Sequence, residues 1–446
     1  MLGGGFGGLA AARSLARAPV RVTLVDRTNH HVFQPLLYQV ATANLAATDI
    51  ATPIRHALRD QCNATVLLAE ATGIDLAARR VLLAEGRPPL AYDYLVVATG
   101  SRHAYFGHPE WEAVAPGLKT LQDALAIRDG LLEVFERAEL ETDGTPAAAM
   151  LTFVIVGGGP TGVELAGMIP EIAHGTLKGE FRRIDPRRAR VVLVEAGPRL
   201  LPALPAPLGE RARRDLEAIG VEVRLGIPVT EVTSHGVRLG DERTGERIAA
   251  RTVLWAAGNQ ASPLGALIAA QAGVEPDRAG RVPVAPDLSV PGHPEVFVVG
   301  DLARVPWQRR AGAPGLVPAL SPAAMQEGRH AGGNVARTVS GKPTLPFRYL
   351  DKGELATIGK HRAVASFLGG RVRVAGWAAW WFWLGLHLFF LIGFRNRLSV
   401  LLQWSYAYLF GDRGARLIVG GTHAGAREEA PRPAAVPERP EHRSAA

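Results

Sequence analysis

The chain has 446 residues and a single cysteine, Cys62. One thiol excludes an intramolecular disulfide and any metal or cluster site built from several cysteines. His30 and His31 have no acidic partner at metal-ligand spacing, so we expect no metal. The sequence has no basic run interleaved with aromatic residues, which disfavours nucleic acid as a partner. No secretory signal precedes the first glycine-rich motif, so we expect a cytoplasmic protein.

The composition is that of a globular protein with a basic balance. Hydrophobic residues make up 47% of the chain and charged residues 21%, and the length allows two or three domains with full cores. The formal net charge is +8 and the sequence pI is about 10.0. Such a balance indicates nucleic acid, an anionic membrane or nucleotide substrates as partners. With nucleic acid disfavoured, membranes and nucleotides remain.

Two glycine-rich motifs are the main positive signal. Residues 3–8 read GGGFGG, residues 157–162 read GGGPTG, and both fit G-x-G-x-x-G. Each leads into a small-residue helix pattern and then into a strand that ends in a carboxylate, Asp26 or Glu195. Bare glycines let backbone N–H groups at a helix N-terminus approach a pyrophosphate, and the carboxylate binds ribose hydroxyls. Two such units predict two bound dinucleotides that exchange electrons.

Buried strand patterns at 94–100, 151–156, 252–258 and 296–301 give the order of the fold. Strands that alternate with helices predict an α/β fold with parallel sheets covered on both faces. The strand at 296–301 has no place in a finished second unit, so we expect it to return to the first. The sequence therefore predicts two Rossmann-like dinucleotide-binding domains, with the second inserted in the first.

Two spacings depart from this pattern. Only Met1 and Leu2 precede the first motif, whereas a strand normally has about 5–6 residues. We expect the natural reading frame to begin several residues upstream; a short but functional first strand is the alternative. Gly162 and Glu195 lie further apart than the usual ~20 residues, which predicts a longer helix and a surface loop around residues 175–180.

A long apolar segment lies near the C-terminus. Residues 374–394 contain no charged residue and four tryptophans, and Arg395 and Arg397 separate them from a second apolar run at 398–410. The length alone fits a transmembrane helix. Crowded tryptophans and flanking arginines favour helices that lie in the membrane interface instead. Both arrangements stay open, and the Pro/Ala/Arg/Glu-rich residues 421–446 are expected to be a disordered tail.

These features together resemble the two-dinucleotide flavoprotein reductases, and most closely the type II NADH dehydrogenases. Those enzymes are single-subunit NADH:quinone oxidoreductases of respiratory membranes. The matching residues are 3–12, 29–41, 156–167, 299–301, 324–328, 351–359 and 389–398. The resemblance implies FAD as cofactor and NADH as substrate. It also implies electron transfer to a membrane quinone without proton pumping, at the cytoplasmic face of the cell membrane and against anionic lipid.

The resemblance also implies a division of the chain. An FAD-binding domain is expected at 1–115 and 286–345, an NADH-binding domain at 116–285, and a C-terminal membrane-association region at 346–420. A homodimer is a further option. The expected contacts to FAD are Gly3, Gly5, Phe6, Gly7, Gly8, Asp26, Gln34, Gly100, Gly300, Asp301, Ala324, Met325 and Lys352. Lys352 is equally interpretable as a surface lysine.

NADH is expected at Gly157, Gly159, Gly162 and Gly258, with Glu195 on the ribose. A carboxylate there repels a 2′-phosphate and favours NADH over NADPH, although the nearby Arg199 could soften that preference. Glu164 matches a family glutamate assigned to proton handling near nicotinamide and quinone; contact with NADH or helix capping is the alternative.

Two residues near the expected quinone position leave the acceptor contacts open. Many family members have an Ala-Gln pair where this chain has Ser321 and Pro322, so a quinone hydrogen bond at that point is not expected. His387 is the single histidine of the apolar segment. It is interpretable either as a packing residue or as a hydrogen-bond donor to a quinone carbonyl.

Other functions fit parts of the sequence. A reductase of ferredoxin, rubredoxin or another protein acceptor shares both glycine motifs, but it needs no tryptophan-rich apolar segment. A sulfide:quinone oxidoreductase works through cysteines, and one is too few. A non-enzymatic NADH-sensing flavoprotein is the third alternative, and the two intact motifs give it no support.

Overall fold

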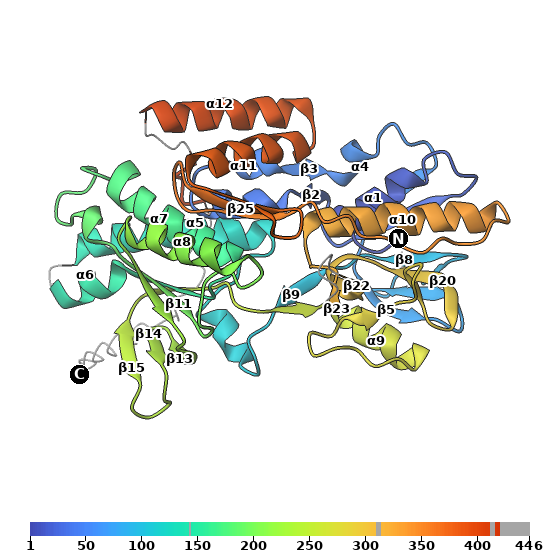
Figure 1. Ribbon diagram of the computed structural model, residues 1–446, viewed down its shortest axis with the longest axis horizontal. Coiled ribbons are helices and arrows are strands. Elements are labelled where there is room, and N and C mark those ends of the chain that lie inside the picture. The colour runs from blue at the N-terminus through green and yellow to red at the C-terminus, as the bar shows by residue number, and fades with distance from the viewer. Residues whose placement is uncertain (142–143, 309–313, 411–414, 420–446) are drawn as a thin grey trace, which may run out of the picture.

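The computed structural model describes residues 1–141, 144–308, 314–410 and 415–419. The predicted disordered tail at 421–446 lies outside the described residues. Two α/β units lie side by side, and two C-terminal helices, α11 and α12, lie together across one edge of the molecule (Figure 1).

The first unit is built on a parallel sheet whose central position is occupied by the start of the chain. Leu2 forms parallel bridges to Val25 and to Val97. The order is therefore β4, β1, Leu2, β8, β20 and β19, with β20 parallel to β8 and antiparallel to β19. These strands are β1 (Val22–Asp26), β4 (Ala64–Leu68), β8 (Leu95–Val97), β19 (Ser289–Val290) and β20 (His293–Val298). The chain thus returns to the first sheet after the second unit, as the strand pattern at 296–301 predicted.

Two long-separated helices pack together on this sheet, α1 (Phe6–Ser14) and α10 (Ser321–Val339). They approach closely because the facing residues are small: a Cβ on Gly328 would lie 2.0 Å from the Gly7 carbonyl oxygen, and one on Gly332 would lie 2.7 Å from that of Ala11. The remaining elements of this unit are α2 (Leu37–Ala41), α3 (Ala47–Ile50), α4 (Ile54–Ala57), α9 (Pro263–Ala272), β2 (His30–Val32), β3 (Ala51–Pro53), β5 (Ala71–Asp75), β6 (Arg80–Leu83), β7 (Leu90–Ala91), β18 (Val282–Pro283), β21 (Ala303–Arg304), β22 (Pro306–Gln308) and β23 (Pro314–Leu316).

The second unit repeats the plan with its full first strand. Its parallel sheet has the order β12, β11, β10 and β16, made of β10 (Thr152–Val156), β11 (Arg190–Glu195), β12 (Val221–Leu225) and β16 (Thr252–Trp255). The helix α7 (Pro160–Glu171) follows the glycine motif and continues as a π-helix to Thr176, so the predicted long helix is present. The other elements are α5 (Leu121–Leu140), α6 (Gly144–Met150), α8 (Ala206–Glu217) and the antiparallel β13 (Val229–Thr233), β14 (Gly236–Leu239) and β15 (Glu246–Ala249).

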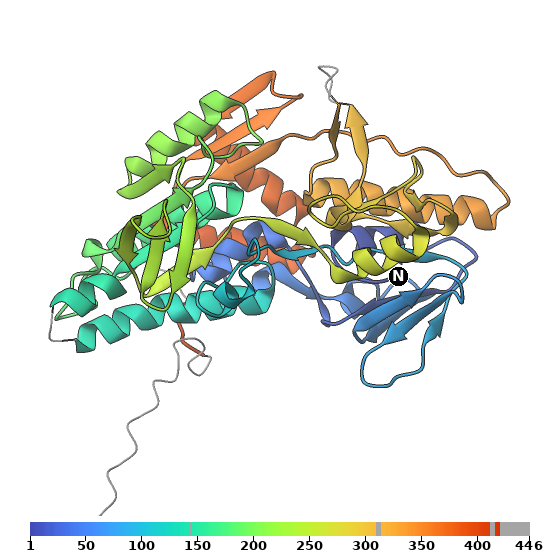
Figure 2. The same cartoon turned by 90° about the horizontal axis from the view of Figure 1, so that it is seen from below.

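The chain crosses between the units on two strands that pair with each other. β9 (Ser101–His103) runs out of the first unit, and β17 (Asn259–Ala261) runs back antiparallel to it. Both views show this ribbon at the centre of the molecule (Figures 1 and 2). It brings the carboxyl ends of the two parallel sheets toward each other.

The C-terminal region is an antiparallel sheet followed by two helices. The sheet has the order β24 (Glu354–Thr357), β25 (Ala363–Phe367) and β26 (Val372–Ala375), and the helices are α11 (Trp377–Phe390) and α12 (Phe394–Phe410). The uncharged stretch at 374–394 is therefore not one helix: it begins in β26, and Gly376 and Gly393, both at positive φ, bracket α11. Within the part of the chain that is described, no helix has both the length and the apolar character to cross a membrane.

Candidate functional site: two nucleotide loops and a buried glutamate

The first glycine loop is shaped by contacts that only glycine allows. Gly3 has φ +93°, and a Cβ there would lie 2.5 Å from the Ala98 carbonyl oxygen. A Cβ on Gly8 would lie 1.8 Å from the carbonyl oxygen of Gly3. Gly5, the N-cap of α1, has no atom within 4 Å of its Cβ position, so this side of the loop is open. The loop thus packs tightly on the sheet and presents a helix N-terminus to a ligand.

Asp26 is held at the carboxyl end of β1, beside this loop. One carboxylate oxygen accepts the Gly4 N–H at 2.5 Å, and the other accepts the Thr28 N–H at 2.7 Å. Phe6 begins α1, and its ring meets the buried His31 ring edge-on at 4.8 Å. The loop, the helix start and the carboxylate therefore form one preorganised unit.

A second group of predicted residues lies where β20 ends. Asp301 accepts a hydrogen bond from the Ser101 hydroxyl at 2.6 Å and lies 3.6 Å from the Lys119 ammonium. The Gln34 side-chain amide donates to the Lys119 carbonyl at 3.2 Å. Gly100, at φ +66°, lies directly before Ser101. Sequence segments far apart thus meet around Asp301.

Glu327 is a buried carboxyl that the sequence did not single out as a site residue. It accepts the Gly300 N–H at 2.5 Å and is 2% exposed. Burial raises the pKa of Glu327 to about 8, and the charge of Asp301 adds to the effect. Ala324 and Met325 lie in the first turns of the same helix, α10.

The second loop repeats the first in detail. Gly157 has φ +112°, and a Cβ on Gly162 would lie 1.8 Å from the Gly157 carbonyl oxygen. Glu195 accepts the N–H of Gly158 at 2.5 Å, as Asp26 does with Gly4, and the N–H of Gly197 at 2.6 Å. Arg199 donates to the carbonyls of Pro202 and Leu204. These bonds hold its guanidinium on the adjacent turn.

A pocket of about 620 Å³ opens over this second loop. It is lined by Gly157, Gly159, Glu195 and Gly258 among others, and it reaches Leu118 and Lys119. Since Lys119 also contacts Asp301, the pocket leads from the second loop to the edge of the first unit. The pocket over the second loop therefore reaches the surroundings of Asp301 in the first unit.

Glu164 is in the first turns of α7, the helix that follows the second glycine loop and contacts β24 of the C-terminal sheet. Its carboxyl accepts the backbone N–H of Thr357, on β24, and burial raises the pKa of Glu164 well above its ordinary value. A raised pKa of this kind favours the protonated form of the carboxyl. Perturbed carboxyls of this kind are typical of catalytic sites.

Two other predicted residues lie on the C-terminal side. Lys352 is exposed, with its ammonium 5.5 Å from the centre of the Phe390 ring on α11. His387 is buried, donates from Nδ1 to the Trp383 carbonyl at 2.8 Å, and stacks on the Trp383 ring. Burial lowers the pKa of His387 to about 4, so the ring is neutral.

Comparison with known proteins shows the family of this chain. A family model described as "Pyridine nucleotide-disulphide oxidoreductase" matches residues 1–328, and one described as "NDH2 C-terminal domain" matches residues 352–413. The type II NADH:quinone oxidoreductase Ndh of Mycobacterium tuberculosis is 45% identical over 93% of this chain and 88% of its own length. The type II NADH:quinone oxidoreductase NdhA of the same organism is 46% identical over 94% of this chain and 88% of its own length.

The chain belongs to the type II NADH:quinone oxidoreductase family. Solved structures support the fold: NDH2 from Plasmodium falciparum in complex with NADH superposes with a TM-score of 0.81 at 19% identity, covering 93% of this chain and 98% of that one. The sulfide:quinone oxidoreductase of Aquifex aeolicus gives 0.68 at 18% identity, with coverages of 92% and 94%. The resemblance predicted from the sequence and the predicted fold class are thus confirmed.

Proposed function

We infer that this oxidoreductase transfers electrons from NADH to a quinone with FAD as cofactor and without proton pumping. The observation that carries this conclusion is that the pocket over the second nucleotide loop reaches Lys119 beside Asp301 of the first unit, in a chain whose C-terminal segment matches the NDH2 C-terminal domain. A protein acceptor is not favoured, because the M. tuberculosis relatives at about 45% identity are named as quinone reductases.

We propose that FAD is held at the first loop by Gly3, Gly5, Phe6, Gly7 and Gly8, with Asp26 on the adenosine ribose. Further contacts to FAD, on the side toward the second unit, come from Gln34, Gly100, Gly300 and Asp301. The positive N-terminal end of α10, at Ala324 and Met325, favours negative charge on its neighbour, and Lys352 adds a cation further out. FAD supplies two-electron acceptance from NADH and donation to quinone. The open side of Gly5 and the cradle at Gly3 fit such a group.

We propose that NADH binds at the second loop, through Gly157, Gly159, Gly162 and Gly258. Glu195 accepts the ribose hydroxyls and repels a 2′-phosphate, which favours NADH over NADPH. Arg199 does not offset this repulsion, because its guanidinium is bonded to two carbonyls of its own turn. The pocket then directs the reacting end of NADH toward the first unit.

We propose that Glu164 supplies a proton during quinone reduction. Quinone becomes quinol by taking two electrons and two protons; the hydride of NADH brings both electrons and one proton equivalent, so one further proton comes from solvent. Glu164 suits that role because its helix, α7, follows the second glycine loop and contacts β24 of the C-terminal sheet. The raised pKa of Glu164 also favours its protonated form.

The test separates the two half-reactions of the FAD-loaded enzyme. In Glu164→Gln, flavin reduction by NADH should stay within about twofold, while reoxidation by a short-chain quinone should slow by about 10- to 100-fold. The wild-type reoxidation rate should also fall as pH rises through the pKa of Glu164, and the variant should lose that dependence. If reoxidation keeps its rate and its pH profile, Glu164 has no proton role.

We propose peripheral attachment to the cytoplasmic face of the membrane, through lipid contacts of α11 and α12. Large apolar side chains stand on the outer side of these helices: Trp377, Trp381, Phe382, Phe389, Phe394, Leu402 and Tyr406 are each at least 50% exposed. Such a continuous apolar patch needs a cover in water. Arg397 donates to the Phe389 and Leu391 carbonyls at the end of α11, which leaves Arg395 as the arginine available to lipid phosphate.

A further inference from the structure

A chain of buried hydrogen bonds begins on the C-terminal helix. The Trp404 indole N–H, on α12, donates to Oε1 of Gln39 at 2.7 Å, and the Asn44 amide donates to the same oxygen at 2.9 Å. Two donors on one oxygen fix the orientation of the Gln39 amide. Its nitrogen therefore faces the other way, toward Tyr38.

The chain continues through two hydroxyls. Nε2 of Gln39 donates to the Tyr38 oxygen at 3.1 Å, and the Tyr38 and Thr357 hydroxyls are 2.9 Å apart. Either hydroxyl can donate in the bond between Tyr38 and Thr357. Tyr38, Gln39 and Thr357 are each no more than 4% exposed, so water does not compete for these bonds.

Thr357 joins this chain to Glu164. Its hydroxyl meets Tyr38, and its backbone N–H donates to the Glu164 carboxyl. The order of contacts along this chain is therefore Trp404, Gln39, Tyr38, Thr357 and Glu164. This line crosses from α12 through α2 and β24 to α7, four elements that are distant in sequence.

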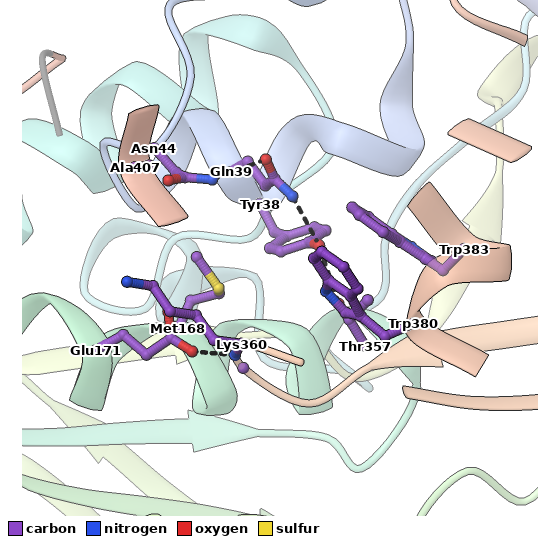
Figure 3. Close-up of a pocket in the computed structure, with 11 residues that line it drawn as sticks. Tyr38, Gln39, Asn44, Met168, Glu171, Thr357, Lys360, Trp380, Trp383 and Ala407 are labelled. Atoms are coloured by element: carbon purple, nitrogen blue, oxygen red, sulfur yellow. Dashed lines mark hydrogen bonds between the residues drawn. The ribbon is translucent and has the colours of Figure 1, made fainter. Parts of the chain in front are cut away.

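The pocket beside these residues is too small to replace a lost partner with more than a single water. Its volume is about 10 Å³, and Figure 3 shows Tyr38 and Thr357 on one side and Glu171 with Lys360 on another. A water needs roughly 10–15 Å³. The Trp383 indole nitrogen, on its wall, has no hydrogen-bond partner within the described residues. Loss of the Tyr38 hydroxyl would remove the partner that the Gln39 amide and the Thr357 hydroxyl share, and at most one water could replace it.

We propose that Tyr38 is a positioning residue for the Glu164 carboxyl, and that docking of α12 holds Tyr38 in place through Gln39. The proposal rests on the proton role of Glu164. The Tyr38 hydroxyl orients the Thr357 side chain, and the Thr357 backbone N–H orients the Glu164 carboxyl. At the other end of the chain, Trp404 on α12 holds Gln39. Seating of the C-terminal helices is thereby a condition for rapid quinone reduction.

The first test is Tyr38→Phe in the full-length, FAD-loaded enzyme, with rates expressed per bound flavin. Flavin reduction by NADH should be unchanged, whereas reoxidation by a short-chain quinone should slow about fivefold or more, as the loss of one buried hydrogen bond implies. The pH dependence of reoxidation should shift with it. Tyr92→Phe is the matched control, because the buried Tyr92 hydroxyl has no partner among the described residues. A merely structural role would lower flavin content and leave both rates per flavin unchanged, which would overturn the proposal.

Two further comparisons locate the effect. Thr357→Val should slow reoxidation as much as Tyr38→Phe does, whereas Thr357→Ser, which keeps the hydroxyl, should reoxidise at the wild-type rate. Trp404→Phe should also slow reoxidation. In the Glu164→Gln background, Tyr38→Phe should add nothing. If Glu164→Gln slows reoxidation and Tyr38→Phe does not, the proton role stands and the positioning role falls. If both slow it and their effects multiply, Tyr38 acts independently of Glu164 and the proposal is wrong.

Discussion

At the scale of single residues, Glu327 shows how the fold stabilises an unusual protonation state. Its carboxyl is buried against Gly300 with Asp301 as the next residue, and its pKa is raised to about 8. The unfolded chain would titrate near its ordinary value of about 4.3. Between these two pH values the folded protein holds a proton that the unfolded chain has released. The free energy of unfolding therefore falls as pH rises through this window.

Glu327→Gln should remove that pH dependence, since a neutral amide can still accept the Gly300 N–H. Relative to wild type, the variant should gain stability between about pH 5 and pH 8, by on the order of a few kcal/mol at the upper end. Thermal unfolding midpoints of both FAD-loaded proteins across this range measure the difference. Parallel curves would mean that Glu327 titrates normally.

At the scale of secondary-structure elements, the closest helix contact is between α1 and α10. A methyl group on Gly328 would lie 2.0 Å from the Gly7 carbonyl oxygen, whereas one on Gly333 would meet nothing within 4 Å. The contact joins backbone to backbone, so no side-chain rotation relieves it. The distance between α1 and α10 is therefore possible only because the residue at position 328 is glycine.

Gly328→Ala should destabilise the protein by about 1–3 kcal/mol and weaken FAD retention, because α1 carries the first nucleotide loop. Gly333→Ala, five residues further along the same helix, should instead be neutral or stabilise by up to about 1 kcal/mol through helix propensity. Unfolding midpoints and flavin content of the two variants report the contrast. Equal effects would show that the interhelix contact is not limiting.

The part of the fold that could be predicted from the sequence is the part made by neighbours in the chain. The glycine loops, the strands after them and the carboxylates Asp26 and Glu195 each follow a local pattern. Lys119 and the Tyr38–Thr357 pair were not predicted, because their partners lie between about 180 and 320 residues away. The break in the uncharged stretch at 374–394 did have a local signal in Gly376 and Gly393, which the hydrophobic run obscured.

At the scale of the whole molecule, polarity is unevenly distributed between surfaces. The outer side of α11 and α12 is apolar and aromatic, while their inner side buries Trp383, Val400 and Trp404 against the body. Figure 1 shows both helices lying together along one edge. With a net charge of +8, the molecule as a whole is also attracted to an anionic surface.

The full-length protein should therefore bind phosphatidylcholine vesicles that contain phosphatidylglycerol, and bind more weakly at high salt. Trp381→Ser with Phe389→Ser should reduce binding by about tenfold or more, since each large apolar side chain contributes about 1.5–3 kcal/mol when buried. Leu140→Ser, at an equally exposed position at the end of α5, is the control and should bind as wild type. Vesicle co-sedimentation measures all three; unaltered binding of the double variant would exclude this face.

The ribbon formed by β9 and β17 also constrains how the two nucleotide units move. Two hydrogen-bonded strands resist shear and torsion, because either would break their shared bonds, but a narrow ribbon bends readily out of its plane. One apolar core also contains Leu36 and Tyr38 of the first unit together with Phe153 and Ile155 of the second, so the units are hindered from rotating against each other. The pocket over the second loop therefore keeps one orientation relative to Asp301 on the first unit.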